Sequence, residues 1–154
     1  MEKIRFIALH EVSEQSLIEL MAHPLVGQHM PLLADGFDVE SFLVAKQALW
    51  DEHGYGPWAF VIYGRFAGWG GLQYENGDPD FALVLHPDYW GWGIRIFRKV
   101  RDEAFNELGL DYMTALLPPG RSNSSALLRL GFVPVGEQKV GGQVFLKFRL
   151  EKQQ

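Results

Sequence analysis

The hydrophobic pattern of the first third of the chain predicts one strand followed by two helices. Residues 4–8 form a short apolar run, and Ser13 can cap a helix whose apolar residues recur at helical spacing. Asp38 can cap a second helix, which Gly54 ends. The residues between them, 24–37, contain Pro, Gly and His and are predicted to form a loop.

The middle of the chain changes to short runs of β-branched and aromatic residues. Residues 58–63 predict a strand, and a two-residue turn at 64–65 leads into a second strand over 66–69. A further turn is predicted at 77–79, followed by a central strand over 80–85.

The last third returns to helical spacing and then ends in strands. The expected elements are a helix over 93–108, a strand over 112–117, a short helix over 124–130 and two strands over 132–139 and 144–150. This order of elements predicts an α/β fold: a mixed sheet of six or seven strands with about four helices packed on it.

Composition supports one folded unit and narrows the chemistry. The 154 residues fit a single domain over 1–150 with a polar tail over 151–154, and 47% of the residues are hydrophobic. The chain has no cysteine, which excludes disulfides, thiolate metal sites and a cysteine nucleophile. Seventeen glycines indicate several tight turns or close backbone approaches.

Charge and hydropathy exclude other classes of partner. The net charge is -5 and there is no run of Lys or Arg, so we expect no nucleic-acid partner. No apolar run reaches membrane-spanning length and the first residues lack a signal-peptide pattern, so we expect a cytoplasmic protein without a membrane partner. No histidine pair has i, i+4 metal spacing, so we expect no metal. The chain is expected to be a monomer or homodimer.

One segment carries a chemical signal: the strand over 80–85 runs into a short loop with Gly91 and Gly93, and the loop opens a helix. Unpaired N–H groups and a partial positive charge at a helix N-terminus favour a phosphate or pyrophosphate there. A G-x-G pair alone also fits an ordinary strand-to-helix turn. The Walker pattern is absent, and Ile96 breaks the G-x-G-x-x-G fingerprint.

Several motifs in order resemble the GNAT superfamily of acetyl-CoA-dependent N-acetyltransferases. Residues 87–93, Pro-Asp-Tyr-Trp-Gly-Trp-Gly, are similar to its P-x-y-W-G-x-G motif, and residues 129–132 supply an R-L-G-F turn. The branch that is most similar is that of the ribosomal-protein alanine N-acetyltransferases. The upstream half adds His-Pro-Leu-Val at 23–26, His-Met-Pro at 29–31, Gly-Pro-Trp-Ala-Phe at 56–60 and Ala-Gly-Trp-Gly-Gly-Leu at 67–72.

The resemblance implies a GNAT-like sheet, mostly antiparallel, that splays between the strands over 80–85 and 112–117. We expect Pro87 and Pro118-Pro119 to keep these neighbours from pairing to their tips. It also implies that acetyl-CoA is the co-substrate. The residues expected to contact it are Leu83, Val84, Leu85, Trp90, Gly91, Trp92, Gly93, Ile94, Arg95 and Asn123.

Two positions depart from the family pattern. Asp88 stands where many members have Gln or Arg, so backbone N–H groups are expected to hold the pyrophosphate. The family's Asn and Ser, eleven and eight residues before the Gly-Phe pair, fall on Gly120 and Asn123, which leaves Asn123, Ser122 or Ser124 to contact the pantetheine.

The catalytic candidates follow from the same comparison. Asp80 stands where this branch commonly has Glu and is the first candidate for the base, although a solvated turn residue fits it equally well; Glu75 is the second candidate. The acid of other branches, a Tyr, falls on Leu127, so Ser124 is the expected proton donor, with Ser122 and Ser125 as alternatives. Tyr112 and Tyr74 are expected to be packing residues.

The predicted function is transfer of an acetyl group to a primary amine, on a small molecule or a peptide, by direct attack in a ternary complex. A non-catalytic acyl-CoA-binding or sensing domain of the same fold is the alternative, because the usual Tyr and Asn are missing. A structural α/β domain whose glycine loop binds nothing is the third hypothesis.

Overall fold

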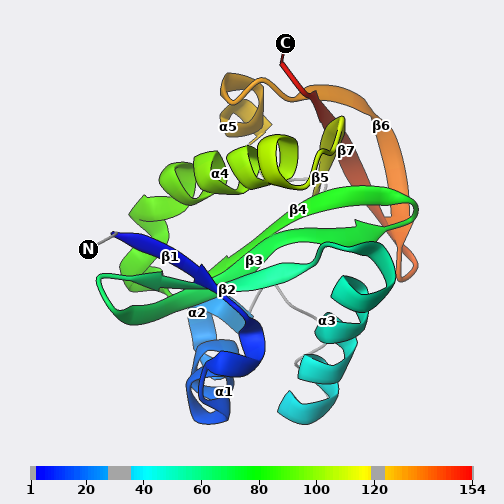
Figure 1. Ribbon diagram of the computed structural model, residues 1–154. Coiled ribbons are helices and arrows are strands. Elements are labelled where there is room, and N and C mark those ends of the chain that lie inside the picture. Colours follow the sequence, from blue (N-terminus) through cyan, green and yellow to red (C-terminus); the bar gives the residue numbers. More distant parts are fainter. Residues whose placement is uncertain (1–2, 28–35, 119–123, 154) are drawn as a thin grey trace.

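A twisted seven-stranded sheet organises the molecule, which a computed structural model describes for residues 3–27, 36–118 and 124–153 (Figure 1). The strands are β1 (Ile4–Ile7), β2 (Pro57–Ile62), β3 (Arg65–Glu75), β4 (Asp78–Leu85), β5 (Tyr112–Leu117), β6 (Val133–Val140) and β7 (Gln143–Glu151). Their order is β1-β2-β3-β4-β5-β7-β6, and every neighbouring pair is antiparallel except β4 and β5. The predicted mixed sheet is confirmed, with β7 extending into the expected tail as far as Glu151.

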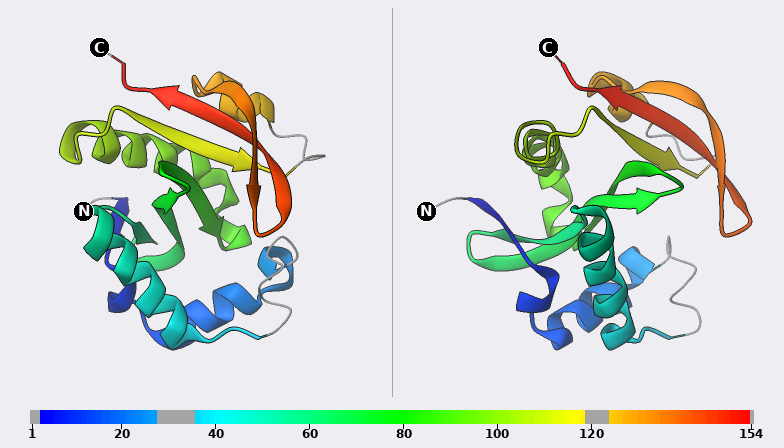
Figure 2. Two further views of the ribbon diagram at one scale, coloured as in Figure 1. Left: turned by 90° about the vertical axis from the view of Figure 1, so that its right-hand side faces the viewer. Right: turned by 45° about the vertical axis from the view of Figure 1, so that its right-hand side comes forward.

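Helices cover both faces of this sheet (Figures 1 and 2). Helices α1 to α3 lie on one face, and α4 and α5 lie on the other. The helical elements are η1 (Leu9–Glu11), α1 (Glu14–Ala22), α2 (Pro24–Gly27), α3 (Val39–His53), η3 (Pro87–Trp92), α4 (Gly93–Asp102), the π-helical turn η4 (Glu103–Glu107) and α5 (Ser124–Arg129). No helix in residues 3–27, 36–118 and 124–153 is both long enough and apolar enough to cross a membrane.

The predicted caps set the ends of the two N-terminal helices. The Ser13 side chain accepts a hydrogen bond from the Ser16 N–H at 3.1 Å, and Asp38 accepts from Ser41 N–H at 3.2 Å. Gly54 ends α3 in the left-handed conformation, with φ of 77°.

The structure corrects the positions of two turns and one loop. The β2–β3 turn is Tyr63-Gly64, and the β3–β4 turn is Asn76-Gly77, each with positive φ at both positions. Two-residue hairpin turns of type I′ need positive φ at both positions, and Asn-Gly is the strongest signal for them. Asp78 therefore lies in β4 and not in a turn. Within the predicted loop over 24–37, α2 begins at Pro24, a residue that suits the first helical position; residues 28–35 lie outside the described residues.

The two helical layers bury separate parts of the core. Under α4, the Phe97 ring lies 5.2 Å from the Phe81 ring and 5.7 Å from the Phe132 ring, so α4 packs against both halves of the sheet. On the other face, Trp69 is buried with Leu17 and contacts Phe42 at 5.0 Å between ring centroids.

The predicted splay lies between β4 and β5, which share a single paired position, Asp80 with Thr114 (Figure 2). The prolines do not explain it, because pairing ends long before Pro87 and Pro118. Strand β4 instead follows β3 closely. A Cβ added at Gly70 would lie 2.3 Å from the Ala82 carbonyl oxygen, so only glycine permits this approach.

Candidate active site

Asp80 lies at the vertex of the splay and is buried there. Only 9% of its surface is exposed, and its Oδ1 accepts a hydrogen bond from the Thr114 hydroxyl at 2.8 Å. Burial, helped by the nearby carboxylates of Glu75 and Asp78, raises the pKa of Asp80 to about 7, against the opposing effects of Thr114 and Lys147. A carboxyl group with this pKa can accept a proton near neutral pH. The prediction that Asp80 begins a strand after a turn is wrong, since it is the third residue of β4.

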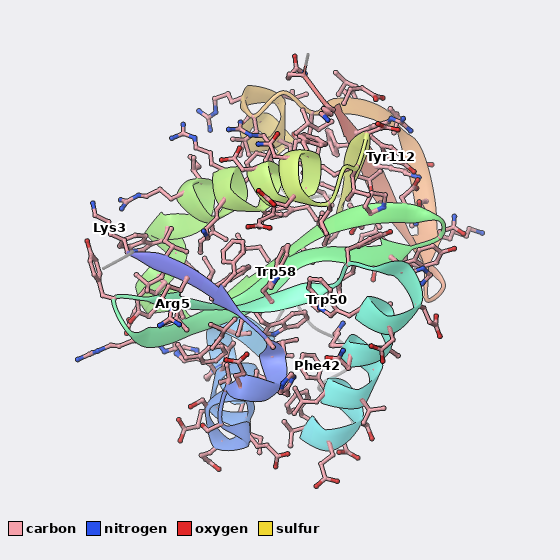
Figure 3. The ribbon with its side chains drawn as sticks, in the orientation of Figure 1. Lys3, Arg5, Phe42, Trp50, Trp58 and Tyr112 are labelled. Carbon is pink, nitrogen blue, oxygen red and sulfur yellow. The ribbon has the colours of Figure 1, made fainter. Side chains whose placement is uncertain are left out.

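Asp78 joins β4 to both β5 and β7 beside Asp80. It accepts hydrogen bonds from the Tyr112 hydroxyl at 2.6 Å and from Lys147 Nζ at 2.5 Å. Burial opposes the charge of Asp78, but these two hydrogen bonds outweigh it and hold the Asp78 pKa below its usual value. The same hydrogen bond raises the pKa of Tyr112 to about 12, so Tyr112, labelled on β5 in Figure 3, is a hydrogen-bond donor as well as a packing residue.

Lys46 of α3 brings a partly buried cation to the same face of the sheet. Its ammonium donates to Gln73 Oε1 and lies 4.9 Å from the Trp69 ring centroid. Gln73 is the β3 partner of Asp80. Burial lowers the pKa of Lys46 to about 8, although the Glu75 carboxylate favours the charged form.

The edge of β4 beyond Asp80 faces the opening of the splay. The His86 N–H donates to the Ala67 carbonyl at 2.8 Å, and hydrogen-bonded positions alternate along a strand. The backbone groups of Val84 therefore face β3, and those of Leu83 and Leu85 face the gap toward β5. In the described part of the chain, β5 pairs with none of these three residues.

The glycine loop forms the short helix η3, which runs directly into α4. His86 caps η3 by accepting the Asp88 N–H at Nδ1. Neither Gly91 nor Gly93 has positive φ, and a Cβ at Gly91 would meet nothing within 4 Å. A Cβ at Gly93 would make only ordinary contact, 3.6 Å from Leu83. These glycines are therefore not required for the turn itself, and their open surface is compatible with the approach of an anionic ligand.

Aromatic and basic side chains surround this loop. Trp90 is 53% exposed and its indole N–H donates to the Leu85 carbonyl, whereas Trp92 is half-buried and packs against the core. The Arg95 guanidinium lies 4.1 Å from the Trp92 ring centroid, and Ile94 is exposed beside it. The Gly93 N–H donates to the Trp90 carbonyl, so it is already used within the protein.

The candidate proton donor is not brought to Asp80 by any described contact. Ser124 is the half-buried first residue of α5, and Ser125 is exposed. Asn123 and Ser122 lie outside the described residues. Leu127 stands at the position of the family's Tyr and has no hydroxyl, and its side chain is buried in the core.

A cavity of about 860 Å³ lies away from this site, between β1, η1 and α3. Trp50, Trp58 and Arg5 line it (Figure 3). Lys46 also contributes to its lining. Asp80 and the glycine loop do not line it. Within the same described residues, no cluster of three or more His, Asp or Glu is placed to hold a metal ion.

Sequence reasoning missed the polar neighbours of Asp80. Thr114, Tyr112 and Lys147 are distant in the chain and belong to no local motif, because strand pairing brings them together. Arg95 and Arg98 lie three residues apart and share one face of α4. A net charge of -5 for the whole chain does not reveal this local basic face.

Comparison with known proteins assigns the family. Residues 4–133 match the family described as the acetyltransferase (GNAT) domain. An acetyltransferase from Agrobacterium tumefaciens str. C58 has a similar fold, with a TM-score of 0.77 and 18% identity over 98% of this chain and 92% of that chain. A spermidine N-acetyltransferase SpeG chimera from Vibrio cholerae and hSSAT gives a TM-score of 0.74 and 12% identity over 97% and 96% of the two chains. The chain therefore belongs to the GNAT family of acetyl-CoA-dependent N-acetyltransferases.

Proposed function

We propose that this enzyme transfers the acetyl group of acetyl-CoA to a neutral primary amine by direct attack in a ternary complex, with Asp80 as the base. The observation that carries the proposal is a buried carboxyl group, with a pKa of about 7, at the vertex of the splay. Asp80 would accept a proton from the amine directly or through water. No acetyl-enzyme is required, and the chain has no cysteine to form one.

The acceptor proposed here is an α-amino group, as in the ribosomal-protein alanine N-acetyltransferase branch. An α-amine with a pKa near 8 costs only about 1–1.5 kcal/mol to deprotonate at neutral pH, whereas a lysine side chain costs roughly 4–5 kcal/mol. One weak base therefore suffices to deprotonate the α-amine. The SpeG relative is a spermidine N-acetyltransferase, so a polyamine is the alternative acceptor to be compared with the α-amine.

The co-substrate is proposed to lie along the open edge of β4. Acetyl-CoA supplies the acetyl group as a thioester, which the amine converts into an amide. Backbone groups of Leu83 and Leu85 would pair with the pantetheine arm. N–H groups after Gly93, in the first turn of α4, would hold the pyrophosphate, with Arg95 nearby.

The remaining predicted contacts are Val84, Trp90, Gly91, Trp92, Ile94 and Asn123 for acetyl-CoA and Ser124 for protonation of the leaving thiolate. They stay predictions, as does the assignment of one acetyltransferase domain over 1–150.

A turnover assay with an amine panel tests the function. Release of CoA thiol from acetyl-CoA would be followed with an N-terminal alanyl peptide, its N-acetylated form and spermidine, alongside calorimetric CoA binding. Turnover of the alanyl peptide supports the proposal, and preference for spermidine moves the acceptor to polyamines. CoA binding without turnover of any amine indicates a sensing domain, and loss of both would leave only a structural role.

Gly91→Val is expected to weaken CoA binding about tenfold or more, because a β-branched side chain would occupy the approach to the backbone of the loop. Calorimetry of CoA binding measures it. The substitution has open space in the unbound protein, so unfolding by urea should change little. Glu137→Val, at an exposed position of the edge strand β6, is a control for an added apolar side chain. Unchanged CoA affinity in a folded Gly91→Val protein would contradict the proposed loop contact.

A further inference from the structure

The polar network beside Asp80 contains one cation with two carboxylates within its reach. Lys147 Nζ lies 2.5 Å from Asp78 Oδ2, and the two side chains are 22% and 16% exposed. Asp78 and Asp80 lie two residues apart on β4, so their side chains share one face of the sheet. If Asp78 loses its charge, the carboxylates that remain beside it on this face are Asp80 and Glu75, the β3 partner of Asp78.

Strand register places the Lys147 side chain across the Asp80 site. Lys147 pairs with Leu116 on β5, two residues beyond Thr114, whereas its partner Asp78 lies two residues before Asp80 on β4. Thr114 lies between these two levels on β5, and its hydroxyl donates to Asp80. The ammonium is thus held at Asp78, two residues before the base on β4.

The other charged groups around Asp80 are engaged elsewhere or are negative. From β3, Glu75 adds a carboxylate; from α3, Lys46 donates to Gln73. From β7, Arg149 is paired with Glu151 at 2.5 Å and lies over the Tyr112 ring. Burial is the largest influence on the pKa of Asp80, and Lys147 is the cation that opposes it.

We propose that Asp78 is a positioning residue that holds the Lys147 ammonium away from Asp80 and so keeps Asp80 able to accept a proton. This inference rests on the proposed role of Asp80 as the base. A direct ion pair between Lys147 and Asp80 would stabilise the carboxylate and make it a weaker base. The Tyr112 hydroxyl fixes the second side of Asp78 and limits its rotation.

The test is the pH profile of kcat/KM for four variants: Asp78→Asn, Lys147→Met, the double variant, and Tyr112→Phe, which keeps both charges. We expect Asp78→Asn to move the acidic limb down by about one pH unit and to lower the plateau several-fold. The double variant should bring the limb back to the parent position or above it, since the cation is gone. Tyr112→Phe should shift the limb less than Asp78→Asn does.

An Asp78→Asn protein in which neither the rate profile nor the titration midpoint of Asp80 moves would overturn the proposal. So would a shift that the double variant does not reverse, because a structural role of Asp78 predicts no rescue by removal of Lys147. A ¹³C NMR titration of the Asp80 carboxyl group in the substrate-free proteins separates this inference from the proposed function. A lower Asp80 titration midpoint in Asp78→Asn with an unmoved rate profile would support the positioning role and refute Asp80 as the base.

Discussion

Asp80→Asn is expected to lower turnover about 100-fold near pH 7 while leaving CoA affinity unchanged. The Asn amide has nearly the same shape and its oxygen can still accept the Thr114 hydroxyl, but it cannot take a proton from the amine. Steady-state rates with the best amine of the panel and calorimetric CoA binding measure the two quantities. If the Asn variant turns over at the parent rate, the base lies elsewhere, with Glu75 or a water chain next to be tested.

The pH dependence gives this substitution a second signature. Asp80, with a pKa of about 7, loses its capacity to accept a proton as pH falls below 7, so the parent rate should decline there. In Asp80→Asn the part of this limb that is due to Asp80 should vanish, which leaves the limb set by the pKa of the amine. The difference between the two proteins should shrink as pH rises past the pKa of the amine, because the amine then deprotonates without help.

Stability supplies the control against misfolding. The Asp80 pKa is raised in the folded protein above its unfolded value of about 3.9, so the folded state binds more protons between pH 4 and 7. Its contribution to stability is therefore lost as pH rises through this window, by on the order of 4 kcal/mol for a shift of about three units. Urea unfolding measures the free energy of unfolding of both proteins at pH 4 and at pH 8. The stability of Asp80→Asn relative to the parent should be higher at pH 8 than at pH 4.

The sequence predicted those parts of the site that local pattern determines. Ser13 and Asp38 cap their helices as expected, and the strand ending at Leu85 leads into the glycine-bearing helical start. Local signals also contained the Asn76-Gly77 turn, which was misplaced by one residue because Pro79 was assigned to the turn. That error removed Asp78 from β4 and hid its role.

The parts that the sequence did not predict depend on contacts between distant strands. Thr114 and Lys147 reach the site only because β5 stands between β4 and β7, an order that no periodicity encodes. Burial of Asp80, which sets its pKa, follows from the same packing. The resemblance predicts the splay, but proline does not account for it, because β4 and β5 pair only at Asp80 and Thr114, well before Pro87 and Pro118. The close approach of β3 to β4 has no signal in the sequence beyond a glycine-rich run.

Gly70→Ala tests the close approach of β3 to β4 and is expected to destabilise the protein by about 3 kcal/mol or more. Its Cβ would lie 2.3 Å from the Ala82 carbonyl oxygen and 3.0 Å from Leu83 Cα, both backbone atoms of the strand that carries Asp80. Relief requires β4 to move, so the folded fraction should also lose acetyl transfer.

Urea unfolding of matched variants separates the contributions. Gly91→Ala, which meets nothing, should stay within about 0.5 kcal/mol of the parent. Gly77→Ala, with φ of 91° and open space, should cost about 1–2 kcal/mol from backbone conformation alone. If Gly70→Ala costs no more than Gly77→Ala, β3 does not hold β4 by close approach.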